Sequence, residues 1–220
     1  MRTIRCQVAG LALLALVPAI ATAQEGRFFR DSWFWGAKAG TAVVGTSTDN
    51  GAAPLVGAEW LITRTRGGLY IGYDHTFLGA WSNDDFTSSV PDPVEGEQVV
   101  RLGDLRRLSA LAVGFPAEFG FIRPYFGIGI SLNFIRQVTP VTGYSSGSQQ
   151  AAVEEIIDEQ QTRAAATFMV GAQAQLLRFS VFGQASYMPA ESDFLLNRRS
   201  TYFFEAGIRY NVGTSIDRPQ

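Results

Sequence analysis

Apolar residues occupy every second position along most of the chain after Asp31, in segments of about ten to fifteen residues. The segment 200–212 has the clearest pattern. Its apolar residues are Tyr202, Phe204, Ala206, Ile208, Tyr210 and Val212. The residues between them include Thr201, Glu205, Gly207, Arg209 and Asn211. Successive side chains of a strand point to opposite faces, whereas a helix would mix these two sets. The pattern therefore predicts strands with one apolar face.

Seven further segments are predicted to be strands: Trp33–Val43, Pro54–Thr63, Leu69–Leu78, Val99–Phe115, Ile122–Phe134, Arg163–Gln175 and Leu177–Tyr187. The segment Val99–Phe115 is assigned mainly from its position, because both of its faces carry leucine and arginine. A two-residue turn at Leu177-Arg178 would pair Leu176 with Phe179, Val170 with Ala185 and Phe168 with Tyr187. These pairs all fall on one face, which favours a hairpin here.

The connections between the predicted strands alternate in length. The short ones are Arg64–Gly67, Pro116–Glu118 and Leu177–Arg178, and the long ones are Gly45–Ala53, Gly79–Gln98, Gln137–Gln161 and Pro189–Arg198. Outer-membrane barrels have an even number of strands, short periplasmic turns and longer outer loops. The sequence therefore predicts an all-β fold, a closed antiparallel transmembrane β-barrel of about eight strands with both ends on the periplasmic side.

The polar faces indicate which side of the strands points inward. They hold mostly Gly, Ser, Thr, Gln and isolated Arg, and charged residues make up only 17% of the chain. A soluble barrel needs a charged surface, so these faces favour the packed interior of a narrow barrel. A soluble periplasmic calycin-like ligand carrier remains the alternative. Aromatic residues near the ends of the apolar faces are expected at the membrane interfaces: Phe168, Phe179, Tyr187, Tyr202, Phe204 and Tyr210.

The first residues resemble a secretory signal peptide. Arg2 and Arg5 precede the apolar stretch Ala9–Ile20, and Ala21-Thr22-Ala23 matches a small-residue cleavage site. The only cysteine, Cys6, falls inside this signal. We therefore expect a cleaved signal peptide (1–23), an N-terminal periplasmic segment (24–31), the outer-membrane barrel (32–213) and a C-terminal tail (214–220). A disulfide is not expected in the mature protein.

Four motifs resemble those of the transmembrane-domain family of outer-membrane protein A and its small eight-stranded relatives. They are the opening strand 33–40 (WFWGAKAG), the triplet 72–74 (GYD), the run 124–129 (PYFGIG) and the ending 207–212 (GIRYNV). The ending is similar to the signal of a last strand that the assembly machinery recognises. The resemblance implies a bacterial outer-membrane location after export, a monomer, and as partners outer-membrane lipid, lipopolysaccharide and the outer-membrane assembly machinery.

Charged residues on the polar faces form the candidate functional set of the interior: Lys38, Glu59, Asp74, Arg123, Arg163, Arg178, Glu205 and Arg209. Charges of both signs in a narrow lumen must pair or be hydrated, because an unpaired buried ion costs several kcal/mol. They can form a narrow pore for ions or small solutes. They can equally form fixed ion pairs that fill a barrel too thin to conduct. The structural interpretation is the leading one.

The sequence gives no specific indication of catalysis, metal binding or nucleic-acid binding. His75 is the sole histidine and points away from Asp74 on a strand, so no catalytic residues are assigned and a lipid-modifying enzyme is disfavoured. The acidic loop residues lack calcium-site spacing, so no metal or other cofactor is expected. Val153, Ile156 and Ile157 have helical spacing and predict a short amphipathic turn that caps the barrel. A net charge of −2 gives no reason to expect nucleic-acid binding. We expect a structural or surface-interaction role through the extracellular loops.

Overall fold

The computed structural model describes residues 29–46, 50–83, 100–140, 147–190, 194–196 and 200–214. The predicted signal peptide, residues 24–28 and most of the predicted tail lie outside the described residues, as does most of the long connection 79–98. Within the described part of the chain, no helix is long and apolar enough to cross a membrane.

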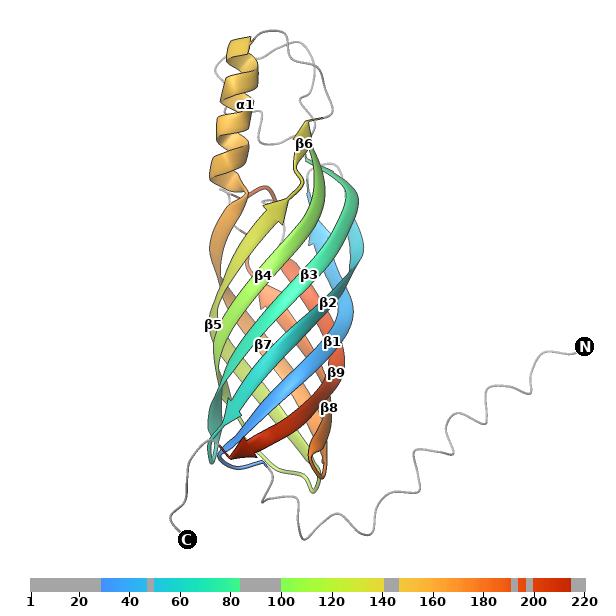
Figure 1. Cartoon of the computed structure of the whole chain (residues 1–220), viewed down its shortest axis with the longest axis vertical. Helices are drawn as coiled ribbons and strands as arrows, with labels where there is room; N and C mark the ends of the chain where they lie inside the picture. The colour runs from blue at the N-terminus through green and yellow to red at the C-terminus, as the bar shows by residue number, and fades with distance from the viewer. Residues whose placement is uncertain are drawn as a thin grey trace, which may run out of the picture.

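Eight long antiparallel strands close into a barrel (Figure 1), as the alternation predicts. They are β1 (Ser32–Gly45), β2 (Asn50–Thr63), β3 (Gly67–Asn83), β4 (Val100–Gly114), β5 (Ile122–Arg136), β7 (Thr162–Leu176), β8 (Phe179–Met188) and β9 (Thr201–Thr214). Each pairs with its sequence neighbours, and β9 pairs with β1 to close the ring. A ninth strand, the two-residue β6 (Thr139–Pro140), pairs with the start of β4. One helix, α1 (Gly147–Gln160), stands beyond the barrel.

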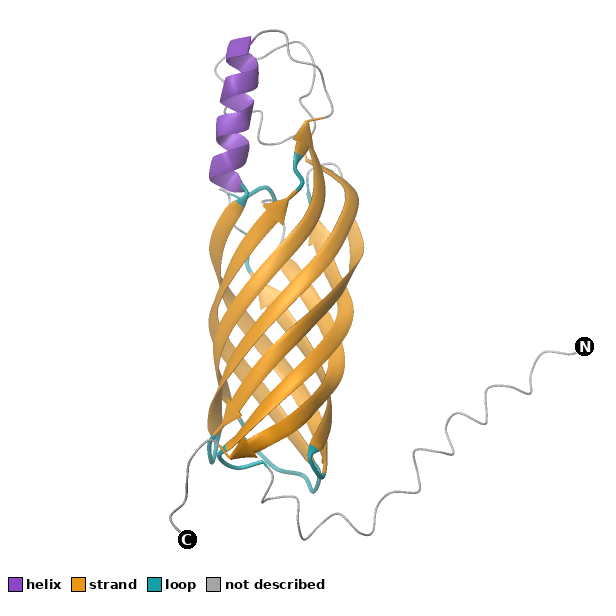
Figure 2. Ribbon diagram, in the orientation of Figure 1, coloured by secondary structure: helices purple, strands orange, loops and turns teal. Residues whose placement is uncertain are grey.

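The two ends of the barrel differ, as the alternating connections predict (Figure 2). At the turn end, short turns join the strands, and Ser32 of β1 pairs with Thr214 of β9. The helix end carries α1 and the long connections. The predicted β7–β8 register is confirmed, because Leu176 pairs with Phe179 and Phe168 with Tyr187. Leu177 has a φ of 59° in the turn between them, a backbone conformation that two-residue hairpin turns often require.

The structure of β4 explains why its sequence pattern is ambiguous. Its inward residues are Val100 and Leu102 and then Leu105, Arg107, Ser109, Leu111 and Val113, so the inward face changes from even to odd positions. Asp104 is also buried, but it pairs with His75 and Arg106 on the outer face. The β3–β4 register shifts at the same place, between Phe77 and Trp81. Residues 78–80 of β3 lie there opposite the single residue Gly103 of β4. Such a β3–β4 bulge disrupts the regular pairing and can move the side chains beyond it to the other face. The alternation therefore breaks within one strand.

Apolar side chains cover the outside of the barrel, and every long strand contributes to this belt. Examples in chain order are Val43, Val56, Leu69, Leu108, Ile128, Val170, Val181 and Ile208, each between 38% and 60% exposed. Moving this apolar surface from an apolar environment into water would cost about 25 cal/mol of free energy per Å². The hydrocarbon interior of a bilayer is the environment that matches this apolar belt. The barrel is therefore of the transmembrane type. A soluble carrier would instead need charged residues there.

Apolar residues also fill the lumen at both ends. The helix-end plug consists of Ala42, Val44, Ala53, Leu55, Leu78, Val100, Leu102, Leu105, Ile135, Val153, Ile157, Ala165, Met188, Phe194, Leu195, Leu196 and Phe203. The turn-end plug consists of Phe29, Phe34, Leu61, Tyr70, Leu111, Val113, Phe115, Tyr125 and Met169. A group of charged side chains, Lys38, Asp74, Arg107 and Glu205, lies between these two layers.

Helix α1 is a fixed part of the helix end. The expected single turn is a helix of 14 residues. Val153 and Ile157, which are four positions apart and so lie on one helix face, are buried in the helix-end plug, and Ile156 packs against it. The opposite face is exposed and includes Glu154, Glu155, Asp158 and Glu159.

Candidate functional site: the charged lumen

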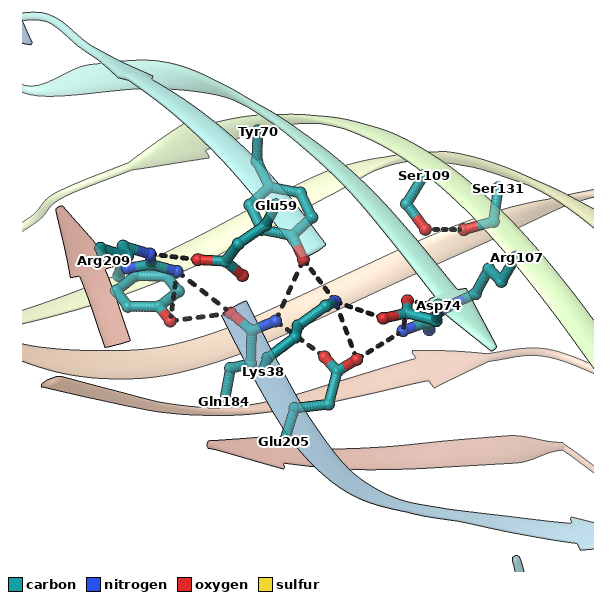
Figure 3. Close-up of polar contacts among 11 residues, drawn as sticks. Lys38, Glu59, Tyr70, Asp74, Arg107, Ser109, Ser131, Gln184, Glu205 and Arg209 are labelled. Carbon is teal, nitrogen blue, oxygen red and sulfur yellow. Dashed lines mark hydrogen bonds and ion pairs between the residues drawn. The ribbon is translucent and has the colours of Figure 1, made fainter. Parts of the chain in front are cut away.

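Four charged side chains from four strands meet in the middle of the lumen (Figure 3). Lys38 Nζ lies 2.7 Å from Asp74 Oδ1 and 2.9 Å from Glu205 Oε1. Arg107 Nη2 lies 2.6 Å from Asp74 Oδ2 and 3.0 Å from the same Glu205 oxygen. All four side chains are at most 2% exposed. Each charge therefore touches two of opposite sign.

A second group surrounds Arg209, whose guanidinium pairs with the Glu59 carboxylate. Arg209 Nη1 also donates to Gln173 Oε1 at 2.5 Å, and Nη2 donates to the Tyr125 hydroxyl at 3.3 Å. The Phe182 ring lies 3.9 Å from the guanidinium carbon. Arg209 is one of the largest fully buried side chains in the described barrel. Hydrogen bonds and aromatic contacts thus replace most of the water that an arginine loses on burial.

Gln184 joins the two groups into one network. Its Nε2 donates to Glu205 Oε2 at 2.7 Å and to the Tyr70 hydroxyl at 3.2 Å, and its Oε1 accepts from the Tyr125 hydroxyl at 2.9 Å. Tyr70 also accepts from Lys38 Nζ at 2.8 Å. The connected set is Lys38 (β1), Glu59 (β2), Tyr70 and Asp74 (β3), Arg107 (β4), Tyr125 (β5), Gln173 (β7), Gln184 (β8), Glu205 and Arg209 (β9). Every long strand of the barrel supplies at least one member.

The network balances its own charge. Its three cations, Lys38, Arg107 and Arg209, face three anions, Glu59, Asp74 and Glu205. A buried pair that loses one partner is destabilised by about 3–5 kcal/mol, because the remaining charge has no water to return to. The network holds the strands together. Beside it, hydroxyls of Ser109, Ser131 and Thr167 bond in a chain at 2.9 and 2.5 Å.

The structure brings together five of the eight predicted lumen charges: Lys38, Glu59, Asp74, Glu205 and Arg209. Arg123 is buried in the lumen, away from this network, and pairs with Glu118 at the turn end. Arg163 lies partly buried near the helix end of β7. Arg178 was wrongly expected to face the lumen. It is exposed in the turn between β7 and β8, because the hairpin needs two residues outside the strands.

Sequence reasoning missed Arg107, which is central to the network. The change of inward face within β4 places Arg107 inward and Arg106 outward, and alternation within β4 gave no sign of that choice. The neighbouring strand offered a signal that Arg107 points inward, since Arg107 pairs with the inward Asp74 of β3. The uncharged members Tyr70, Tyr125, Gln173 and Gln184 lie on polar faces of the predicted strands and were missed as partners because their contacts cross the lumen.

Outward aromatic residues gather near the two ends of the belt. Phe168, Tyr187 and Tyr202 follow one another across three strands toward the helix end, where ring centres lie 6.2 and 5.3 Å apart. Phe204 is also exposed on the same stretch of β9. Phe179 and Tyr210 are paired at the turn end, 5.1 Å apart. Their position at the bilayer interfaces stays a prediction.

Three tryptophans extend the turn-end aromatic group. Trp35 and Trp60 are stacked with ring centres 5.6 Å apart, and Trp33 meets Trp60 edge-on at 5.2 Å. All three point outward, and Trp35 is 55% exposed. The sequence alone could have predicted these tryptophans as interfacial residues, because they lie in alternating strands and tryptophan favours membrane interfaces.

His75 lies on the outer surface beside the β3–β4 bulge. Its Nε2 is 3.2 Å from Asp104 Oδ2, which also accepts from Arg106 Nε at 2.9 Å, and its ring stacks on Phe77. Within the described residues, no group of three or more His, Cys, Asp or Glu side chains is arranged to hold a metal ion. The acidic residues of the connection 84–99 lie outside those residues.

The barrel is similar to known bacterial outer-membrane barrels in its fold. Neisserial surface protein A matches with a TM-score of 0.52 and 12% identity over 81% of this chain and 96% of its own. The Yersinia pestis attachment invasion locus protein Ail, in complex with the heparin analogue sucrose octasulfate, has a TM-score of 0.49 and 10% identity, covering 83% of this chain and 99% of Ail.

The N-terminal β-barrel domain of Pseudomonas aeruginosa OprF also has a TM-score of 0.49, with 12% identity, covering 83% of this chain and 98% of the domain. No protein-family model and no curated protein sequence matches the chain. The likeness to Neisserial surface protein A thus shows a shared fold, that of a small eight-stranded outer-membrane barrel.

Proposed function

We propose that this protein is a non-conducting outer-membrane barrel that acts through its helix end, on the outside of the cell. The observation that carries the proposal is the way α1 is held. Val153 and Ile157 anchor it in the helix-end plug, while Glu154, Glu155, Asp158 and Glu159 remain exposed. A helix fixed at one position presents a defined surface at low entropic cost on binding. Such a surface suits a structural or surface-interaction role.

The lumen supports a structural rather than a conducting interior. Its mid-layer charges are paired, and apolar plugs fill it above and below. An ion crossing the barrel would have to break buried pairs and pass two apolar layers. A narrow pore is the second candidate function, and the observation that favours it is the presence of six ionised groups in the lumen.

The outer surface supports the expected lipid partners. Arg101, Arg106 and Arg136 lie on the outward side of β4 and β5 near the helix end. Arginines at this height extend toward the charged headgroups and attract their phosphates. We therefore propose that the helix end lies in the outer leaflet, in contact with lipopolysaccharide, and that the barrel is a monomer. Catalysis is not proposed, because His75 lies on the outer face of the barrel and contacts Asp104, which also pairs with Arg106.

Cysteine labelling of intact cells tests the orientation. In a Cys6→Ser background, Glu155→Cys on α1 should react with a membrane-impermeant maleimide before the cells are permeabilised. The matched variant Ala117→Cys, in the short connection between β4 and β5, should react only afterwards. The reverse order of labelling would refute the proposed orientation.

Planar-bilayer recording of the refolded protein tests the absence of conductance. We expect inserted barrels to show no discrete openings, with heat-modifiable gel migration as proof of folding. Steady openings whose conductance changes in Glu205→Gln would instead establish the pore.

A further inference from the structure

A pocket of about 400 Å³ opens at the turn end of the barrel. It is lined by Phe29, Arg30, Thr65, Arg66, Phe115, Pro116, Ala117, Glu118 and Arg123. These residues come from the segment before β1, the β2–β3 turn, the β4–β5 connection and the start of β5. The pocket therefore lies at the opposite end of the barrel from α1 and is no part of the surface discussed above.

The pocket has an excess of positive charge. Three of its lining residues are arginines and one is a carboxylate, Glu118. The side chains of Arg30 and Arg66 are exposed and have no ion-pair partner among the described residues. Their neighbour Arg64, by contrast, lies 3.8 Å from Asp31. Cations that converge on a concave surface without counter-charges favour an anionic ligand.

Arg123 is the buried member of this group, with 2% of its surface exposed. One edge of its guanidinium donates to Glu118, and its face lies over the Phe29 ring at 4.4 Å. Its Nη1 is buried without a hydrogen-bond acceptor. A buried, charged donor without an acceptor is costly. Arg123 thus retains hydrogen-bonding capacity that the described residues do not satisfy.

The floor of the pocket is held in place by the turn-end plug. Phe29 packs edge-on against Phe115 with ring centres 4.8 Å apart, and its carbonyl accepts from the Thr63 hydroxyl. The Phe115 amide donates to the Arg66 carbonyl at 2.9 Å. The backbone that carries Arg66 is therefore linked to the apolar floor. A cation set whose supports are fixed loses little freedom when it binds an anion.

We propose that this pocket binds a small dianion, either a phosphate monoester or a dicarboxylate, from the compartment that the turn end faces. Oxygens of the anion accept from Arg30 and Arg66 at the mouth and from Arg123 at the base. The Glu118 carboxylate, half exposed, limits the site to small ligands by repelling anions from one side. Phe29 closes the lumen behind the pocket, so the site captures its ligand and does not pass it through the barrel.

Amide chemical shifts of the refolded full chain in dodecyl maltoside, a detergent without phosphate, test the proposal. Inorganic phosphate and succinate are titrated separately at constant ionic strength set with chloride. We expect saturable shifts confined to residues around Thr65, Arg66 and Ala117. Saturation by phosphate alone would identify a phosphoryl ligand, and saturation by succinate alone a dicarboxylate.

Variants of exposed arginines separate the site from general charge attraction. Arg66→Gln and Arg30→Gln should each raise the dissociation constant at least tenfold. Arg64→Gln, in the same turn but outside the pocket, should leave it unchanged. None of these side chains is buried, so folding is expected to be unaffected. Shifts that do not saturate with either anion, or an equal loss of binding in Arg64→Gln, would overturn the proposal.

Discussion

At the scale of single residues, the interior of this barrel depends on the pairing of opposite charges. Glu205 illustrates this dependence, because its two oxygens accept from Lys38, Arg107 and Gln184. All three donors are buried, so they cannot turn to water if Glu205 is lost. The loss of one carboxylate therefore affects charges contributed by several strands.

Glu205→Gln should lower the free energy of unfolding by about 3 kcal/mol, because two cations lose a shared counter-charge in a buried site. Urea unfolding in phospholipid vesicles, followed by tryptophan fluorescence, measures the change. The same substitution at the exposed Glu155 of α1 is the control and should stay within about 0.5 kcal/mol of the parent protein. Equal stability of the two variants would contradict the buried network.

Gly40 is required by the close approach of β1 to β9. A Cβ atom at this position would lie 2.0 Å from the Phe204 carbonyl oxygen and 2.9 Å from Glu205 Cα. Gly40→Ala should cost about 1–3 kcal/mol, since the backbone of one strand must move. Gly183→Ala on β8 is the matched control, because nothing lies within 4 Å of its added methyl group. The fraction of heat-modifiable, folded protein after refolding compares the two, and comparable yields would argue against the steric explanation.

At the scale of elements, β4 and α1 mark the limit of what alternation can predict. All eight long strands and the β7–β8 register could be predicted. One face of each strand meets lipid and the other meets the lumen, which imposes a period of two on the sequence. The β3–β4 bulge could not be predicted, since the change of inward face within β4 makes both faces of its sequence look mixed. Arg107 was missed and Arg178 was wrongly placed in the lumen for related reasons: each lies where strict alternation stops. The length of α1 depends on the plug beneath it, which no local pattern of Val153 and Ile157 specifies.

Val153→Asp should release α1 from the barrel, because a carboxylate would replace a fully buried methyl pair in the helix-end plug. Hydrogen exchange of the α1 amides is expected to become at least tenfold faster, with little change in the middle of the strands. Ala151→Asp places the same charge on the exposed side of the helix and serves as the control. Unchanged α1 protection in Val153→Asp would mean that the plug does not hold the helix.

At the scale of the whole molecule, the barrel has the layered exterior of a membrane protein. Apolar side chains form the belt, three of the four tryptophans gather at the turn end, and outward arginines lie near the helix end. Trp33, Trp35 and Trp60 therefore predict the depth of the turn end in the bilayer. Aromatic rings with a polar N–H group prefer the headgroup boundary to the hydrocarbon interior.

Brominated phospholipids test that depth. In a Trp81→Phe background, bromines close to the headgroup should quench tryptophan fluorescence more strongly than bromines at the chain ends. A barrel whose four tryptophans are replaced by phenylalanine and whose Ile128 is replaced by tryptophan should show the opposite order, because Ile128 lies midway along β5. The same quenching order in both proteins would indicate a different position in the membrane.

The lumen network also has a consequence for the order of assembly. Because each of the eight long strands contributes a member, the network is incomplete until β9 meets β1. An open sheet in lipid would leave several ions of both signs unpaired as well as backbone groups on its edges. Partly assembled forms are therefore high in free energy, and closure is all-or-none. The charged interior therefore favours the closed barrel with every strand in register over any barrel in which a strand is misplaced.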